Sequence, residues 1–145
     1  MGMVAEPMDK GLADHLQSGL PLLPETLVKD FAWDELTASS IWAFGPTYHG
    51  TNMLIDYTLP SDTDKNRLSQ VRDFLVQGFH WATKEGPLCE EPIKNVKFKL
   101  LNGHFADEPI YRGGSQIIPT ARRVCYSSFL LATPKIMEPV YLAEI

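Results

Sequence analysis

Residues 65–84 read KNRLSQVRDFLVQGFHWATK, and their hydrophobic pattern predicts a long amphipathic helix. Apolar side chains recur at steps of three and four residues, which places them on one helix face; they are Leu68, Val71, Leu75, Phe79 and Ala82. Ser61 or Asp62 can cap the start of this helix, and Gly86-Pro87 ends it. We expect the apolar face to be buried against a sheet.

Strands are predicted on both sides of this helix. Residues 42–44 and 53–55 indicate two strands joined by a turn-rich segment at 45–50. After the helix, apolar residues alternate with mostly polar ones over residues 95–101, as in a strand with one buried face. Residues 139–145 begin another alternating pattern that is typical of a strand.

A second helix is predicted over residues 116–132. Its apolar stripe consists of Ile117, Ala121, Val124, Cys125, Ser128 and Phe129. Pro119 is tolerated there because it falls in the first turn. The order strand, strand, helix, strand, helix, strand predicts an α+β fold, in which a four-stranded sheet has two helices on one face.

The first forty residues predict a helical extension that packs on this domain. Residues 8–17 suit a short helix, and a second helical pattern passes through Leu27, Phe31, Leu36 and Ile41. Asp34 and Glu35 lie in a first turn, where acids complement the helix dipole. The chain therefore divides into an extension at 1–41, a domain at 42–132 and a final segment at 133–145.

Charge is distributed unevenly along the 145 residues, whose net charge is −5. Residues 1–64 contain ten acids and two bases, whereas residues 91–123 contain six bases and three acids. An acidic chain with one mildly basic segment predicts protein partners, with at most weak RNA contact. No apolar stretch approaches the roughly 20 residues that span a bilayer, and no signal peptide is recognisable. We therefore expect a soluble intracellular protein with no membrane association. We also expect the isolated chain to be a monomer.

Motifs for catalysis are not recognisable in the chain. No glycine is followed by lysine, so a phosphate-binding loop of the GxxxxGK[ST] type is absent. The four histidines lack metal-ligand spacing, and the two cysteines, Cys89 and Cys125, form no metal or nucleophile motif. His104 stands near Asp107 and Glu108, which is compatible with an acid–base pair or with plain solvated loop charge. We therefore expect no enzyme activity, metal or cofactor in this fragment.

Two basic segments have alternative interpretations. Arg112-Gly113-Gly114-Ser115 precedes a helix, so its backbone amides could hold an anion, or the glycines could simply form a turn. Arg122 and Arg123 could bind a phosphate or an acidic partner near that loop, or their stems could pack over the core.

Residues 110–122, IYRGGSQIIPTAR, resemble the tip of domain IV in eukaryotic elongation factor two. That family has a histidine, which is converted to diphthamide, where Tyr111 stands, and a third glycine where Ser115 stands. Further motifs extend the resemblance over the whole chain; they are residues 6–13, 40–46, 55–61, 86–91 and 95–99. Together they resemble domain IV of the elongation-factor-two-like GTPases of the U5 small nuclear ribonucleoprotein. Ala43 and residues 58–61 favour this spliceosomal branch.

The resemblance implies the fold of the second domain of ribosomal protein S5, with residues 133–145 as the linker and first strand of a following ferredoxin-like domain. It implies a nuclear, non-catalytic domain that serves pre-mRNA splicing as a docking surface and lever, in a parent protein that binds GTP. The implied partners are U5 proteins, namely the large scaffold protein and an RNA helicase. The tip residues expected to dock a partner are His104, Tyr111, Arg112, Gly113, Gly114, Ser115, Gln116, Arg122 and Arg123.

Two alternatives remain at this stage. A translation translocase domain would share the fold and most of the motifs, but Tyr111 disfavours it because tyrosine cannot become diphthamide. A small phosphate-binding enzyme could use the Gly113-Gly114 loop, since sugar and mevalonate kinases share the S5-like fold, although fold alone does not establish function.

Overall fold

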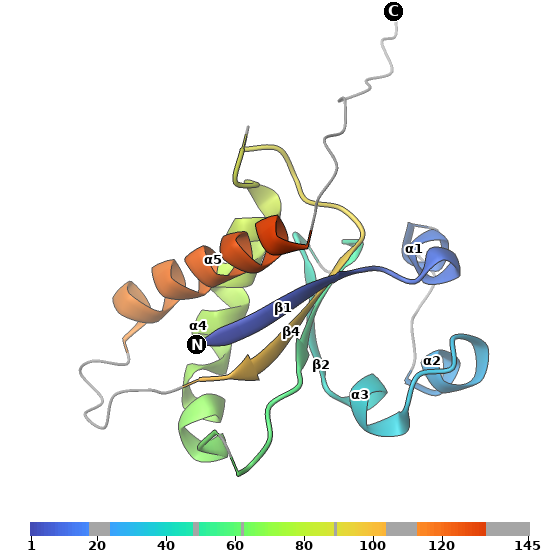
Figure 1. The fold of residues 1–145 in the computed structure, drawn as a ribbon, viewed down its shortest axis with the longest axis horizontal. Coiled ribbons are helices and arrows are strands. Elements are labelled where there is room, and N and C mark those ends of the chain that lie inside the picture. Colours follow the sequence, from blue (N-terminus) through green and yellow to red (C-terminus); the bar gives the residue numbers. More distant parts are fainter. Residues whose placement is uncertain (18–23, 48–49, 62, 89, 104–112, 133–145) are drawn as a thin grey trace, which may run out of the picture.

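A computed structural model describes residues 1–17, 24–47, 50–61, 63–88, 90–103 and 113–132. In chain order the elements are β1 (Gly2–Pro7), α1 (Lys10–Gln17), α2 (Pro24–Asp30), α3 (Glu35–Ser39), β2 (Ile41–Gly45), β3 (Asn52–Asp56), α4 (Lys65–Lys84), β4 (Val96–Asn102) and α5 (Gly114–Leu131). Figure 1 shows α4 and α5 together on one side of the sheet and the three short helices on the other. The α+β fold class predicted from the sequence is confirmed. No helix within the described ranges is long and apolar enough to cross a membrane.

The sheet has the strand order β1-β4-β3-β2. The β3 and β4 strands are parallel and are connected through α4, whereas both outer pairs are antiparallel. A parallel pair needs a long crossover, which explains why the longest helix lies between these two strands in the chain. The crossover also brings the carboxyl ends of β3 and β4 to the same end of the sheet, with Asp56 opposite Leu100.

The fourth strand of this sheet is β1, which we had assigned to the helical extension. Residues 2–7 pair with β4 in a register that runs from Gly2 opposite Asn102 to Pro7 opposite Val96. The sequence GMVAEP lacks a clear alternation of apolar and polar residues, and its partner is about ninety residues away along the chain. Local patterns therefore did not reveal it. The strand predicted at 139–145 lies outside the described residues.

The core between the sheet and the two long helices is built from the predicted apolar face of α4. Phe79 is fully buried, and its ring meets the ring of Phe98 edge-on at 5.8 Å between centroids. Leu54 and Cys125 complete the centre of this cluster. The α4 helix has the predicted bounds, but its cap is Asp64 rather than either predicted residue, and the Asp64 side chain accepts hydrogen bonds from the Asn66 and Arg67 amides.

The second long helix starts two residues earlier than predicted, at Gly114. Pro119 therefore lies in the second turn of α5 rather than in the first. Within the predicted stripe, Ile117, Ala121, Cys125 and Ser128 are buried. Phe129 is only half-buried, and it packs against the edge of the same core as Phe79.

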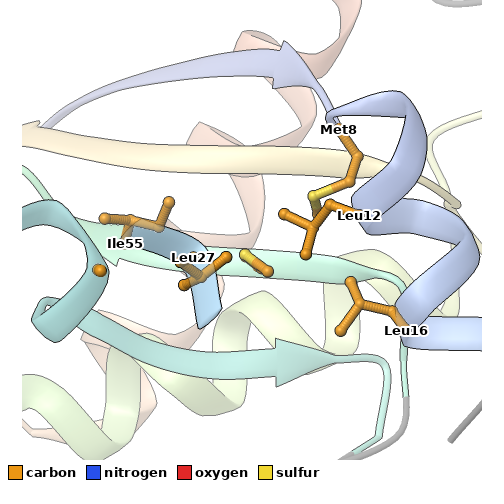
Figure 2. Packing of buried hydrophobic residues seen from close by; sticks show 7 residues of the cluster. Met8, Leu12, Leu16, Leu27 and Ile55 are labelled. Atoms are coloured by element: carbon orange, nitrogen blue, oxygen red, sulfur yellow. The ribbon is translucent and has the colours of Figure 1, made fainter. Parts of the chain in front are cut away.

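The three short helices cover the opposite face of the sheet. Figure 2 shows Met8, Leu12 and Leu16 pointing toward Leu27 and Ile55 in this second core. The helical pattern predicted from Leu27 to Ile41 is divided into α2 and α3, because Ala32 between them has a positive φ of 57°.

Helix α3 begins at the predicted acidic turn. The Asp34 side chain caps it by accepting a hydrogen bond from the Thr37 amide at 3.2 Å. Hydrogen bonds from Thr37 lower the pKa of Asp34 below its usual value.

Strand β4 is covered on both faces, contrary to the prediction of one buried face. Lys97 is only 9% exposed. Its Nζ lies 3.2 Å from Asp9 Oδ1 and 5.2 Å from the centre of the Trp33 ring. Trp33 Nε1 donates to the other oxygen of Asp9 at 2.5 Å. This Lys97–Asp9–Trp33 clasp joins three parts of the chain: the residue just before α1, the segment before α3, and strand β4. A lysine therefore occupies a buried strand position that is usually apolar.

Candidate docking interface

The described part of the predicted tip loop follows the end of β4 and forms the start of α5, which packs against the middle of α4 at Phe74. Gly103, which is buried, follows β4 directly, and Gly113 precedes α5. His104, Tyr111 and Arg112 fall within residues 104–112, outside the described residues. Among the predicted tip residues, the structure therefore describes Gly113, Gly114, Ser115 and Gln116 at the start of α5, and Arg122 and Arg123 farther along the helix.

The first turn of α5 shows what its two glycines contribute. Gly113 occupies the cap position with φ −73° and ψ 160°, a conformation open to any residue, and its carbonyl accepts from the Gln116 and Ile117 amides. Gly114 instead packs closely on α4, because a Cβ there would lie 3.0 Å from a ring carbon of Phe74, a contact that the ring must relieve by a small shift. Ser115 and Gln116 are exposed. The turn thus presents polar side chains outward while it packs closely on α4.

Two bases beside the tip are paired with carboxylates. Lys65 Nζ lies 3.3 Å from Asp56 Oδ2 and donates to the Thr58 carbonyl at 2.9 Å. Arg67 Nε lies 3.5 Å from Asp64 Oδ2. Each pair offsets one positive charge near the carboxyl end of β3 that a phosphate group would need.

Sequence reasoning missed two exposed apolar side chains at this end. Tyr57 is 47% exposed and Leu59 is 59% exposed, and both follow β3 directly. The Tyr57 amide donates to the Leu100 carbonyl at 2.9 Å, which holds Tyr57 beside the end of β4. Lys99 Nζ lies 5.0 Å from the centre of the Tyr57 ring. The apolar run of β3 stops at Asp56, so only the loop geometry shows that these side chains face solvent.

Arg122 is not brought to the tip. It follows Gly114 by eight residues, which is about 12 Å along a helix. Its guanidinium lies 4.0 Å from the centre of the Trp81 ring, near the carboxyl end of α4. The structure thus separates Arg122 from the start of α5 and places it on Trp81, while Arg123 next to it is exposed.

Residues 23–133 match the family described as elongation factor G, domain IV. The chain belongs to this family. It is 52% identical, over 99% of its length, to the 109 kDa U5 small nuclear ribonucleoprotein component GFL of Arabidopsis thaliana. The identity is 51% to the 110 kDa U5 component CLO of the same plant and 52% to the pre-mRNA-splicing factor cwf10 of Schizosaccharomyces pombe. The chain spans 15% of the length of each of these relatives. The resemblance drawn from the sequence motifs is confirmed.

The elongation factor G domain IV match begins at residue 23, but the folded unit begins earlier. Strand β1 completes the sheet, and α1 supplies Leu12 and Leu16 to the second core. The three relatives match nearly the whole chain and so include both elements.

Within the described ranges no group of three or more histidine, cysteine or acidic side chains could hold a metal ion. Burial raises the pKa of the Cys125 thiol to about 12. A thiol with that pKa is protonated at neutral pH and is a poor nucleophile.

Proposed function

We propose that this chain is domain IV of an elongation-factor-like GTPase of the U5 small nuclear ribonucleoprotein. It would serve pre-mRNA splicing in the nucleus as a non-catalytic docking and lever domain during activation and disassembly of the spliceosome. The observation that supports this proposal is the identity of about one half, across the full chain, to two U5 components and a splicing factor. GTP would bind elsewhere in the parent protein, and this domain would hold no cofactor.

A lever must move as one body, and the packing of the domain suits that role. The Lys97–Asp9–Trp33 clasp fastens the short helices to the sheet. On the other face, α4 and α5 approach so closely at Gly78 that a Cβ there would lie 2.6 Å from the Ala121 Cβ. Such dense packing transmits displacement with little internal deformation.

The docking surface that we propose combines the predicted tip with the apolar loop beside it. Tyr57 and Leu59 are exposed after the end of β3, where the Tyr57 amide donates to the Leu100 carbonyl, and the sequence places Tyr111 and Arg112 in the segment between β4 and α5. Exposed aromatic side chains are frequent anchors in protein interfaces. The partners would be U5 proteins, with the large scaffold protein and the RNA helicase as the first to test.

The experiment is a pull-down from nuclear extract with the immobilised chain. We expect U5 proteins to be retained and ribosomes to be absent. Tyr111→Ala and Tyr57→Ala should each reduce retention, whereas Val28→Ala should not, because Val28 is exposed on α2 and lies outside the proposed docking surface. Circular dichroism melting of every variant would separate lost binding from lost folding.

Recovery of ribosomes instead of U5 proteins would favour a translation translocase. If both tyrosine variants retained U5 proteins fully, the tip would not be part of the interface. A titration with ATP and GTP tests the phosphate-binding alternative, and our proposal requires that neither nucleotide binds to this chain.

A further inference from the structure

A cluster around Arg122 lies where the second halves of α4 and α5 meet. The Arg122 guanidinium stacks on Trp81 at 4.0 Å and lies 4.9 Å from the centre of the Tyr126 ring. Arg122 Nε donates to Tyr126 Oη at 3.0 Å, and Tyr126 Oη donates to the Glu85 carbonyl. The orientation of the guanidinium is therefore set by two rings and a hydrogen bond.

The charge of Arg122 has no counter-ion among the residues that the structure describes. Four other bases, Lys65, Arg67, Lys97 and Lys99, each form an ion pair with a carboxylate. Glu85 is an acidic residue of the same cluster, and its Oε2 accepts a hydrogen bond from Trp81 Nε1 at 3.1 Å. Helix α5 itself contains no acidic residue. Arg122 is thus an oriented cation whose remaining N–H groups are available to a ligand.

Exposed apolar side chains lie within this cluster and near it along the chain. Trp81 is 39% exposed and Leu130, one turn beyond Tyr126 on α5, is 48% exposed. Leu88 is 66% exposed and follows Glu85 by three residues. Tryptophan, tyrosine and arginine are the residues most enriched among the energetically dominant positions of protein interfaces.

We propose that Trp81, Arg122, Tyr126, Leu88 and Leu130 form a docking surface, here the Arg122 surface, for a protein segment that has an Asp or Glu next to aliphatic residues. The carboxylate would take the open edge of the guanidinium in the paired geometry that arginine favours. The aliphatic residues would cover the exposed apolar side chains. Stacking fixes the guanidinium before binding, so less side-chain freedom is lost when the partner arrives.

A nucleic acid is a poorer fit to the same surface. Binding of a phosphate backbone rests on several Lys or Arg contacts along the strand. Here one oriented arginine stands beside Glu85, and Glu90 and Glu91 follow within a few residues. These acids would repel successive phosphates, while a single carboxylate needs only the guanidinium. The Arg122 surface is distinct from the tip, and the inference does not depend on the splicing role.

The test is a nuclear magnetic resonance titration of the full chain that follows the indole N–H of Trp81. The probe is a short synthetic leucine-rich peptide with one central glutamate, and the control peptide has glutamine in place of that glutamate. Trp81→Phe identifies the Trp81 signal among the three tryptophans. We expect the acidic peptide to shift this signal and the glutamine peptide to shift it at least tenfold more weakly.

Two arginine variants provide the decisive comparison. Arg122→Lys retains the charge but loses the planar fork and the stacking, and we expect the affinity for the acidic peptide to fall about tenfold. Arg123→Gln is the matched control, since Arg123 is exposed and lies outside the cluster, and its affinity should stay within twofold. Melting curves of both variants show whether the fold is retained.

Several results would overturn the inference. One is equal binding of the acidic and glutamine peptides, and another is unchanged affinity in a folded Arg122→Lys variant. Absence of any Trp81 shift with the acidic peptide would also reject it. A Trp81 shift with a uridine oligonucleotide but not with the peptide would reassign the surface to RNA.

Discussion

The substitution Gly78→Ala tests the close contact between α4 and α5. A Cβ at Gly78 would lie 2.6 Å from the Ala121 Cβ and 2.8 Å from the Ile118 carbonyl oxygen. Carbon atoms in favourable contact are about 3.5–4.0 Å apart, so the overlap with Ala121 is about 1 Å. Because the Ile118 atom belongs to the backbone, the contact cannot be relieved by a change of side-chain rotamer, and the two helices must separate.

Two opposing terms determine how far Gly78→Ala changes the free energy of unfolding. Alanine is more favourable than glycine inside a helix by about 1 kcal/mol. Overpacking a well-filled core costs about 1–3 kcal/mol, and the size of the overlap places this site near the upper end. We expect a net loss of about 1–2 kcal/mol, which lowers the melting temperature of a domain of this size by roughly 3–6 °C. Circular dichroism melting of the purified chain measures this directly.

Gly11→Ala in α1 is the matched control. Gly11 is exposed, and a Cβ there would meet only a ring carbon of Phe31 at 3.3 Å. This variant should melt within about 1 °C of the parent, because the helix gain and the mild contact nearly cancel. A second control is the pair Gly78→Ala with Ala121→Gly, which removes the 2.6 Å contact. The pair should be less destabilised than the sum of its two single changes. A melting temperature raised by Gly78→Ala would refute the proposed helix contact.

Three further changes test other parts of the structure. Phe79→Ala should cost about 3–5 kcal/mol and Phe129→Ala distinctly less, because Phe79 is fully buried and Phe129 is not; equal losses in urea unfolding would contradict this packing. Asn52→Ala should lower the free energy of unfolding by about 2–3 kcal/mol, because the buried Asn52 side chain bonds to backbone groups of Gly45, Ile93 and Val96 that would lose their partner. An unchanged urea midpoint would argue against this hydrogen-bond network. Cys125 should stay unalkylated by iodoacetamide at pH 8 and react only after denaturation, because burial raises the pKa of its thiol to about 12. Peptide mapping by mass spectrometry measures the alkylation of each cysteine. Rapid labelling of Cys125 in the native protein would show that the thiol is accessible.

Local patterns predicted the elements whose signal is repeated over many residues. Helix α4 has five apolar residues on one face, and its bounds were predicted correctly from that periodicity and from Gly86-Pro87. Strand β3 was predicted from a short apolar run because the strand is buried on both faces. Strand β1 was missed because its six residues are stabilised by pairing with β4, a contact that no local pattern records.

The candidate site, like the fold, was predicted only in part from the sequence. The motif of residues 110–122 pointed to the family, which the match over residues 23–133 confirms. The docking roles of His104, Tyr111 and Arg112 remain predictions, since these residues lie outside the described ranges. The position of Arg122 was not predictable, because it depends on where α5 begins and on which α4 side chains face it.

The sequence by itself determined the family, the α+β class and the helices whose apolar faces repeat at short range, because these depend on residue order and local periodicity. Only the tertiary structure decided which strand completes the sheet, why Lys97 is buried and why Arg122 is oriented without a described counter-ion. The physical reason is that each of these rests on contacts between residues far apart in the chain. Trp33 and Asp9 surround Lys97, and Trp81 supports Arg122, only after the layers have packed together.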